Sequence, residues 1–144
     1  MEGPAAFPAV TANGDEAMEQ QDNESKKAQL LDGMAKERGY MHPSFLYLAD
    51  KDLNFLAAYN ALYGCALNEG KALPVKTREF IAMGILAYRG LADGVFEHAK
   101  RAIQYGASEQ ELLEAFETMV IPGGTPTFAT GLTALMRIQA AGKS

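Results

Sequence analysis

The chain has 144 residues, of which 48% are hydrophobic and one is cysteine, and its formal net charge is −5. A chain of this length buries roughly two thirds of its unfolded surface, so one domain can fold without metals, and a single cysteine excludes an internal disulfide. There is no basic stripe of the kind that binds nucleic acid and no apolar run near the ~18 residues of a membrane span; the composition therefore argues against both partners and favours a cytoplasmic protein.

The negative charge is concentrated at the N-terminus. Residues 1–24 hold six acidic residues and no lysine or arginine, whereas residues 25–144 hold twelve acidic and thirteen basic residues. A segment rich in acids, proline and glycine is typical of disorder. We therefore expect residues 1–24 to be a flexible acidic tail, with a leader without function as the favoured interpretation, and residues 25–144 to form a single all-α domain. The six acids are Glu2, Asp15, Glu16, Glu19, Asp22 and Glu24.

Residues 25–67 carry a helical pattern in two parts. From Ser25 onward, apolar residues recur at helical spacing until Gly39, a residue type that commonly ends helices. His42-Pro43 begins a second segment, in which apolar residues recur at steps of three and four. This second pattern fits either one long core helix or two short helices.

Residues 74–90 form the next predicted helix. Pro74 suits the first turn of a helix that is apolar nearly all round after Glu79 and ends at Gly90. A helix without a polar face is typical of burial on every side. We therefore expect this helix to lie at the centre of the domain.

The next predicted helix, from Ala92 to about Tyr105, carries His98, one of two histidines in the chain. Each helical residue advances by about 100°, so His98 shares a side with Leu91 and Gly94, at the edge of the apolar face. The charged residues around it are expected to point into water. They are Glu97, Lys100 and Arg101.

The C-terminal third also reads as helical. Ser108 and Glu111 have the spacing of a capping box, and the helix that they open is stopped by Pro122-Gly123-Gly124. Thr125-Pro126 then begins a last helix, and no segment shows the alternation typical of a strand. Helices joined by short connections predict an all-α fold, an antiparallel helical bundle of about six helices.

Glu79 is the second unusual residue, because it stands in an apolar stripe of the central helix. A buried carboxylate needs a partner, and a glutamate beside His98 would favour the charged form of both groups, an arrangement that can serve acid–base chemistry. The alternatives are a structural ion pair, a pair with Lys76 one turn back, or a pair with a basic group of another subunit. Taken alone, each of the two residues is more often structural than catalytic.

An ordered set of motifs extends over residues 72–138. It contains K-x-R-E, a histidine nineteen residues after the glutamate, A-x-x-x-G-A-S with the capping box, and a Pro-Gly-Gly turn. In these motifs the chain resembles the carboxymuconolactone decarboxylase family, which includes the alkyl hydroperoxidase D proteins. The resemblance implies an alkyl hydroperoxidase D-like all-α domain, assembly as a homotrimer or hexamer with the site near subunit contacts, and a role in aromatic compound catabolism.

The resemblance places Glu79 and His98 at the glutamate and histidine positions of the family. In the hydroperoxidase branch a C-x-x-C pair completes a thiol proton relay, and its two positions fall here on Leu91 and Gly94. The thiolate is the nucleophile of that chemistry, so a peroxidase using this dithiol is excluded. Decarboxylase members usually carry a histidine and acidic groups in this turn, and Leu91 and Gly94 depart from that pattern too. Asp93 stands where the hydroperoxidase branch often has another polar relay residue, but on the helix it points about 140° away from His98.

The leading hypothesis is a cofactor-independent decarboxylase or lyase that acts on a small organic acid or lactone. His98 would transfer the proton, and Glu79 would orient the His98 ring. Leu91, Asp93 and Gly94 would line a roomier, less polar pocket suited to an apolar or aromatic substrate. The alternative is a non-catalytic member of the family that binds a small molecule or forms an oligomeric scaffold. No motif for a metal or a nucleotide occurs, so we expect neither a metal nor another cofactor.

Three other side chains invite a chemical interpretation. A peroxide-detoxifying protein that uses Cys65 and an external thiol is the weakest hypothesis, because a lone cysteine without an adjacent base is more often buried and inert. Tyr59 and Tyr63 share a helical face and could offer phenols to a pocket, although aromatic residues at that spacing more often serve packing.

Overall fold

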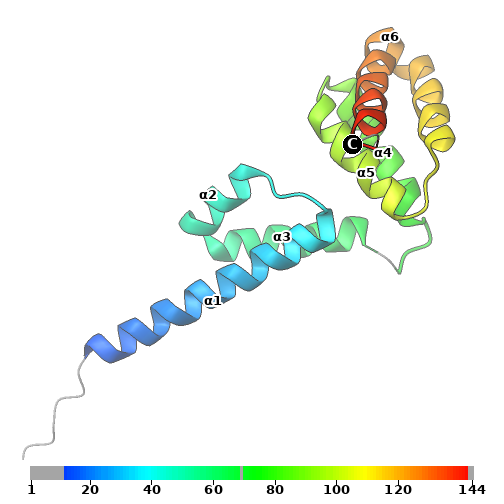
Figure 1. The fold of residues 1–144 in the computed structure, drawn as a ribbon. Helices are drawn as coiled ribbons and strands as arrows, with labels where there is room; N and C mark the ends of the chain where they lie inside the picture. Colours follow the sequence, from blue (N-terminus) through cyan, green and yellow to red (C-terminus); the bar gives the residue numbers. More distant parts are fainter. Residues whose placement is uncertain (1–11, 69, 143–144) are drawn as a thin grey trace, which may run out of the picture.

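The computed structural model describes residues 12–68 and 70–142, which form six helices and no strand (Figure 1). The predicted all-α fold is therefore confirmed. None of the helices in the described part of the chain combines the length and the apolar character that a membrane span requires. The helices are α1 (Ala12–Arg38), α2 (Pro43–Lys51), α3 (Leu53–Leu67), α4 (Val75–Tyr88), α5 (Ala92–Gln104) and α6 (Glu109–Ala141).

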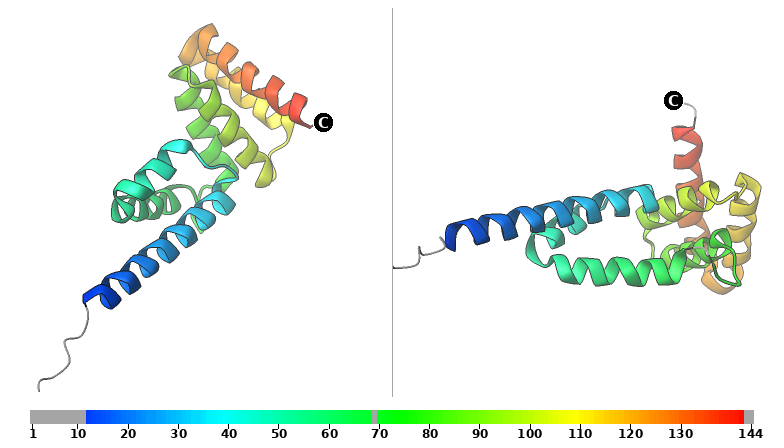
Figure 2. Two further views of the ribbon diagram at one scale, coloured as in Figure 1. Left: turned by 60° about the vertical axis from the view of Figure 1, so that its left-hand side comes forward. Right: turned by 90° about the horizontal axis from the view of Figure 1, so that it is seen from below.

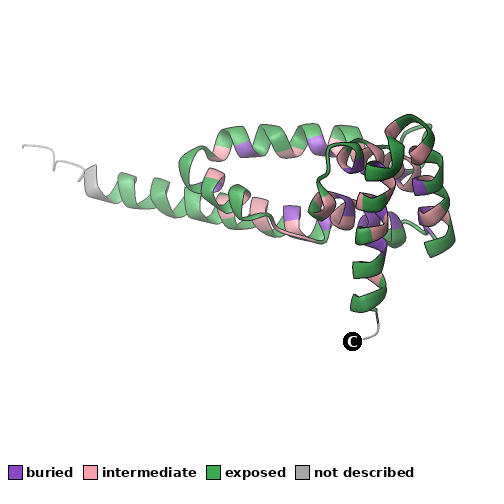
Figure 3. Ribbon diagram, turned by 90° about the horizontal axis from the view of Figure 1, so that it is seen from above, coloured by how far each residue is buried: buried purple, intermediate pink, exposed green. Residues whose placement is uncertain are grey.

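The helices form two groups. The helices α4, α5 and α6 pack into a bundle at one end of the molecule, and α1 extends away from it beside α2 and α3 (Figures 1 and 2). The bundle has a core that includes Met83, Val95 and Phe116, whereas a smaller core around Met34 and Leu56 joins α1, α2 and α3. Burial is concentrated in the bundle and where α1 and α3 approach it, while the far part of α1 is exposed (Figure 3).

Local capping explains the boundaries of α2 and α3. The His42 side chain caps α2, since its Nδ1 lies 3.2 Å from the backbone nitrogen of Ser44. Asp52 then ends α2 and caps α3, because its side chain accepts a hydrogen bond of 2.9 Å from the backbone N–H of Phe55. A capping side chain offers the backbone an alternative to continued helix. Of the two possibilities left open by the sequence, two short helices are therefore correct.

The predicted capping box is present at the start of α6. The Ser108 hydroxyl accepts a hydrogen bond from the Glu111 backbone over 3.1 Å, and the Glu111 carboxylate accepts one from the Ser108 backbone over 2.9 Å. The Lys76 ammonium, followed by the Ser108 N–H, holds the pKa of the Glu111 carboxyl below its usual range. The helix end predicted at Pro122-Gly123-Gly124 is a kink within α6. Gly124 has φ 76°, a conformation that favours glycine, and the helix continues after it.

The N-terminal helix starts earlier than the sequence indicated. We expected helix from Ser25, whereas α1 begins at Ala12. Residues 12–24 include alanine, glutamate, glutamine and methionine, which are strong helix formers, and Asp22 pairs with Lys26 one turn on at 2.5 Å. Residues 1–11 of the predicted tail lie outside the described residues. The flexibility of the tail and the single-domain assignment of residues 25–144 stay predictions.

The helix α4 is less enclosed than its sequence predicted. Its inner face is buried, but Ile81 is 53% exposed, Ile85 is 58% exposed and Tyr88 is 71% exposed. In the single chain only α5 and α6 pack extensively against α4, so the expectation of burial on every side is wrong for the isolated subunit. These side chains line an open apolar groove of about 610 Å³ between α4 and α6.

Gly131 allows the two halves of α6 to pack closely. A methyl group at this position would overlap the ring of Phe116, which is fully buried. We therefore expect Gly131→Ala to lower the free energy of unfolding by about 1–3 kcal/mol, as overpacking of a core does.

Gly33→Ala is the matched control, because Gly33 lies exposed in α1 with nothing near the added carbon. Its expected effect is a gain of about 0.5–1 kcal/mol, since alanine favours helix more than glycine does. Urea denaturation of both variants provides the measurement. Equal stabilities for the two variants would contradict the packing at Gly131.

Candidate functional site

The structure brings together the two residues that the sequence singled out. Glu79 lies on the inner face of α4 and is fully buried, and its Oε2 is 2.6 Å from Nδ1 of His98 on α5. The two helices are antiparallel neighbours, so nineteen residues of chain return His98 to the level of Glu79. Glu79 is therefore paired in the interior of the bundle.

The contact with Glu79 defines how the imidazole of His98 is held. A carboxylate accepts hydrogen bonds, so Nδ1 of His98 carries the proton that Glu79 accepts. The other ring nitrogen, Nε2, makes no hydrogen bond to any described residue, and the side chain keeps 15% of its surface exposed. The ring thus has one nitrogen fixed by a carboxylate and one without a partner among the described residues.

Arg101 is the third member of this cluster, and its predicted exposure is wrong. It was expected to point into water, but it is 1% exposed and its Nη1 donates to Oε1 of Glu79. Its Nη2 donates to the Asn68 side chain over 3.1 Å and its Nε donates to the Glu37 carbonyl over 3.3 Å. Arg101 therefore links α5 to the ends of α1 and α3.

The periodicity of α5 alone does not indicate that Arg101 is buried, because this burial depends on α1 and α3 covering that side of α5. The sequence does contain one indication that Arg101 lies near Glu79. Arg101 follows His98 by three residues, which places the two side chains within about 60° of each other on the helix. Neighbours at that spacing contact the same surroundings, so the partner of His98 was also within reach of Arg101.

Lys76, one alternative partner of Glu79, is bound elsewhere. Its Nζ lies 2.7 Å from Oε1 of Glu111 at the start of α6. The alternative in which Lys76 neutralises Glu79 is therefore wrong, and Arg101 takes that place.

A cavity of about 670 Å³ lies beside the N-terminal half of α5, and its wall includes all three residues predicted to line a pocket, Leu91, Asp93 and Gly94. His98 is one turn further along the helix and is not among the lining residues. The rest of the wall comes from α4, α5 and the segment around α2. These residues are Tyr40, His42, Phe45, Leu86, Gly90, Ala92 and Glu97.

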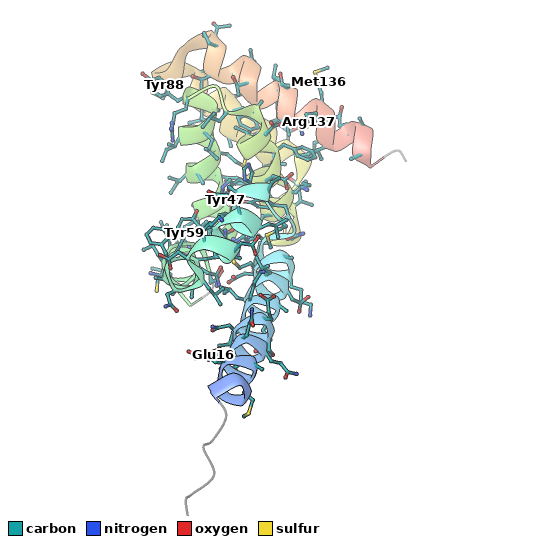
Figure 4. The ribbon with its side chains drawn as sticks, turned by 90° about the vertical axis from the view of Figure 1, so that its left-hand side faces the viewer. Glu16, Tyr47, Tyr59, Tyr88, Met136 and Arg137 are labelled. Carbon is teal, nitrogen blue, oxygen red and sulfur yellow. The ribbon has the colours of Figure 1, made fainter. Side chains whose placement is uncertain are left out.

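The turn that carries cysteines in the hydroperoxidase branch has a different environment here. The space next to Gly94 is filled by the side chain of Leu86, which an added carbon would meet at 3.2 Å. The wall is therefore apolar, but Gly94 does not by itself enlarge the cavity. Asp93 is 94% exposed and pairs with Arg137 of α6 at 2.7 Å, not with His98 (Arg137 is labelled in Figure 4).

Of the remaining predicted candidates, Tyr63 lies beside this cluster, with its ring centroid 5.5 Å from the Cζ of Arg101, and Tyr59 lies against Arg38. Cys65 on α3 is exposed, so the expectation that it is buried is wrong; α3 is covered on one side only. Among the described residues, no group of three or more histidine, cysteine, aspartate or glutamate side chains could hold a metal ion.

Helical packing and site together define a class of protein: an all-α bundle whose central helices bury a glutamate between a histidine and an arginine. The sequence profile of the carboxymuconolactone decarboxylase family matches residues 54–136. The match covers more than half of the chain, and the chain belongs to this family. The profile begins within α3, earlier than the motifs at residue 72 had indicated.

Two solved structures have the same fold. A protein from Burkholderia xenovorans LB400, provisionally named a carboxymuconolactone decarboxylase, is 23% identical with a TM-score of 0.70, over 85% of this chain and 98% of that chain. A carboxymuconolactone decarboxylase family protein from Legionella pneumophila is 21% identical with a TM-score of 0.61, over 80% of this chain and 96% of that chain. At these identities the likeness shows the fold alone. A comparison with curated protein sequences found no significant match.

Proposed function

We propose that this protein is a cofactor-independent lyase of its family that acts on a small organic acid or lactone by acid–base chemistry. The observation that carries the proposal is the buried Glu79 carboxylate bound to Nδ1 of His98, with Nε2 of the same ring left free. An imidazole with one nitrogen fixed in this way can accept and donate a proton through the other nitrogen.

Glu79 and Arg101 support this role electrostatically. The Arg101 guanidinium, 1% exposed, donates a hydrogen bond to one oxygen of Glu79 and supplies its counter-charge. The carboxylate in turn stabilises the imidazolium that forms when Nε2 of His98 takes up a proton. Both are therefore positioning residues, and His98 is the group proposed to meet the substrate.

In a decarboxylation, the bond between the substrate carbon and its carboxylate breaks and carbon dioxide leaves. The electron pair stays on the carbon, and the Nε2 proton of the His98 imidazolium is transferred to that carbon. The neutral imidazole then regains a proton from water. A double-bond migration would use the same nitrogen, first as base and then as acid.

The cavity beside α5 supports the choice of substrate class. Leu86, Leu91 and Phe45 give it an apolar wall, and Asp93 and Glu97 supply acidic groups. An apolar or aromatic portion of the substrate would lie against this wall, and the reacting carbon would have to extend past Gly94 to His98, one turn further along α5.

We also propose that the protein assembles as a homotrimer or hexamer. The open apolar groove between α4 and α6, with the exposed Ile81, Ile85 and Tyr88, supports a contact between copies of the chain. Light scattering of the purified protein is expected to give three or six times the chain mass. A monomer at micromolar concentration would contradict this assembly.

The function is tested by incubating the protein with a panel of aromatic and apolar carboxylic acids and lactones in D₂O. We expect a product with one solvent deuteron on the carbon that lost the carboxylate, seen by NMR. Cys65→Ser should turn over the same compound equally well, which would separate this chemistry from the thiol hypothesis. Binding without turnover of any panel member would favour the non-catalytic alternative.

A further inference from the structure

Arg38, the last residue of α1, is a buried cation without an acidic partner. It is 2% exposed, and no aspartate or glutamate among the described residues lies within ion-pair distance of it. Its Nη2 donates to the Asn60 side chain over 2.8 Å, while Nε and Nη1 are buried and make no hydrogen bond within residues 12–68 and 70–142. An unpaired charge in the interior is costly, so such a group usually has a partner or a ligand.

Aromatic rings surround the guanidinium. The Arg38 Cζ lies 3.9 Å from the ring centroid of Tyr63, 4.8 Å from that of Phe45 and 5.5 Å from that of Tyr59. Cation–π contacts of this kind offset part of the desolvation of a cation. They leave its N–H groups unpaired, because a ring face is not an acceptor in the plane of the guanidinium.

The hydroxyl of Tyr63 is a second unpaired polar group in the same place. It is buried and has no hydrogen-bond partner in the part of the chain that the structure describes. Burial raises the pKa of the Tyr63 phenol, so the group stays neutral and keeps a proton to donate. Arg38 and Tyr63 thus offer hydrogen-bond donors, and one of them is positively charged. A carboxylate is the ligand that needs both features.

This cluster adjoins both the cavity and the Glu79 site. Phe45 covers Arg38 and also lines the cavity beside α5. The Tyr63 ring centroid is also 5.5 Å from the Cζ of Arg101, and Arg101 binds Glu79. Tyr59, the third aromatic residue around Arg38, lies in the region of α2 and α3, between the bundle and the free end of α1 (Figure 4).

We propose that Arg38 and Tyr63 form a subsite for a carboxylate of the substrate, which enters from the cavity past Phe45. The substrate is then an organic acid whose apolar or aromatic portion occupies the cavity while its carboxylate meets Arg38. The identification of the ligand as the substrate depends on the proposed function, whereas the subsite itself does not.

The test compares benzoate, an aromatic carboxylate, with benzamide, its neutral analogue. Sodium sulfate, added separately at equal ionic strength, is the control for a general effect of anions. Thermal unfolding and calorimetric titration of the purified full chain are the measurements. We expect benzoate to raise the unfolding temperature and to bind at least tenfold more tightly than benzamide. Sulfate should have little effect, because it cannot occupy an apolar cavity.

Variants then assign the binding to the two residues. Arg38→Met should fold with unchanged or higher stability, since it removes an unpaired buried charge, and should lose the response to benzoate. A merely structural arginine would instead make this variant less stable. Tyr63→Phe keeps the ring and should weaken benzoate about tenfold, as loss of a hydrogen bond to a charged group does, so the test does not depend on the folding of Arg38→Met.

Equal responses to benzoate and benzamide, or a benzoate response that survives both substitutions, would overturn the subsite. An equal response to sulfate would show a general anion site and would also overturn it. His98→Gln should still bind benzoate. If it does, and yet turns over substrate like the wild type, the proposed function fails while the subsite stands.

Discussion

Replacing Glu79 with leucine is expected to lower the free energy of unfolding by about 3–5 kcal/mol, the cost of removing one partner from a buried ion pair. The variant leaves the Arg101 guanidinium, 1% exposed, without a counter-charge, and it leaves Nδ1 of His98 without an acceptor. Chemical denaturation followed by far-UV circular dichroism measures this loss.

Two comparisons make the result specific to the buried cluster. In Glu79→Leu/Arg101→Met both charges are absent, so the loss should be smaller than the sum of the two single losses. Asp93→Asn breaks the exposed pair with Arg137, and it should cost no more than about 1 kcal/mol. A Glu79→Leu variant as stable as the wild type would show that Glu79 and Arg101 are not paired in solution.

Replacing His98 with alanine is expected to lower turnover of the substrate by about 10²–10⁴-fold, the usual contribution of a general acid or base. The loss should appear in kcat more than in KM, because the side chain is proposed to act on the proton and not to hold the substrate. Steady-state assays with the compound identified in D₂O provide the measurement, on protein shown to keep its helicity and its oligomeric state.

Arg38→Met is the matched comparison for His98→Ala. It should raise KM, because Arg38 is proposed to hold the carboxylate, so the two variants separate chemistry from binding. Full turnover by His98→Ala would remove His98 from the mechanism and would favour a structural role for its pair with Glu79. The cavity would then have to supply another proton donor.

The sequence by itself determined the features that depend on neighbours along the chain. The capping box at Ser108 and the turn at Gly39 depend on side-chain caps and on the conformational freedom of glycine, which act over a few residues. The pairing of Glu79 with His98 was also predictable, because a carboxylate in an apolar stripe requires a partner and the spacing resembled that of a known family. The start of α1 at Ala12 was not predicted, because an acidic composition is typical of disorder, whereas the alanine, glutamate and glutamine of residues 12–24 also favour helix.

Only the tertiary structure decided which side chains other helices cover. Arg101 and Arg38 look like solvent-exposed charges in their own helices, yet both are buried where α1, α3 and α5 meet. Ile85 and Cys65 show the opposite difference, because their sequence context predicts burial whereas both side chains are exposed in the single chain. The physical reason is that helical periodicity shows which faces are apolar, whereas the burial of a charge depends on partners supplied by distant segments, here the Glu37 carbonyl, Asn60 and Asn68.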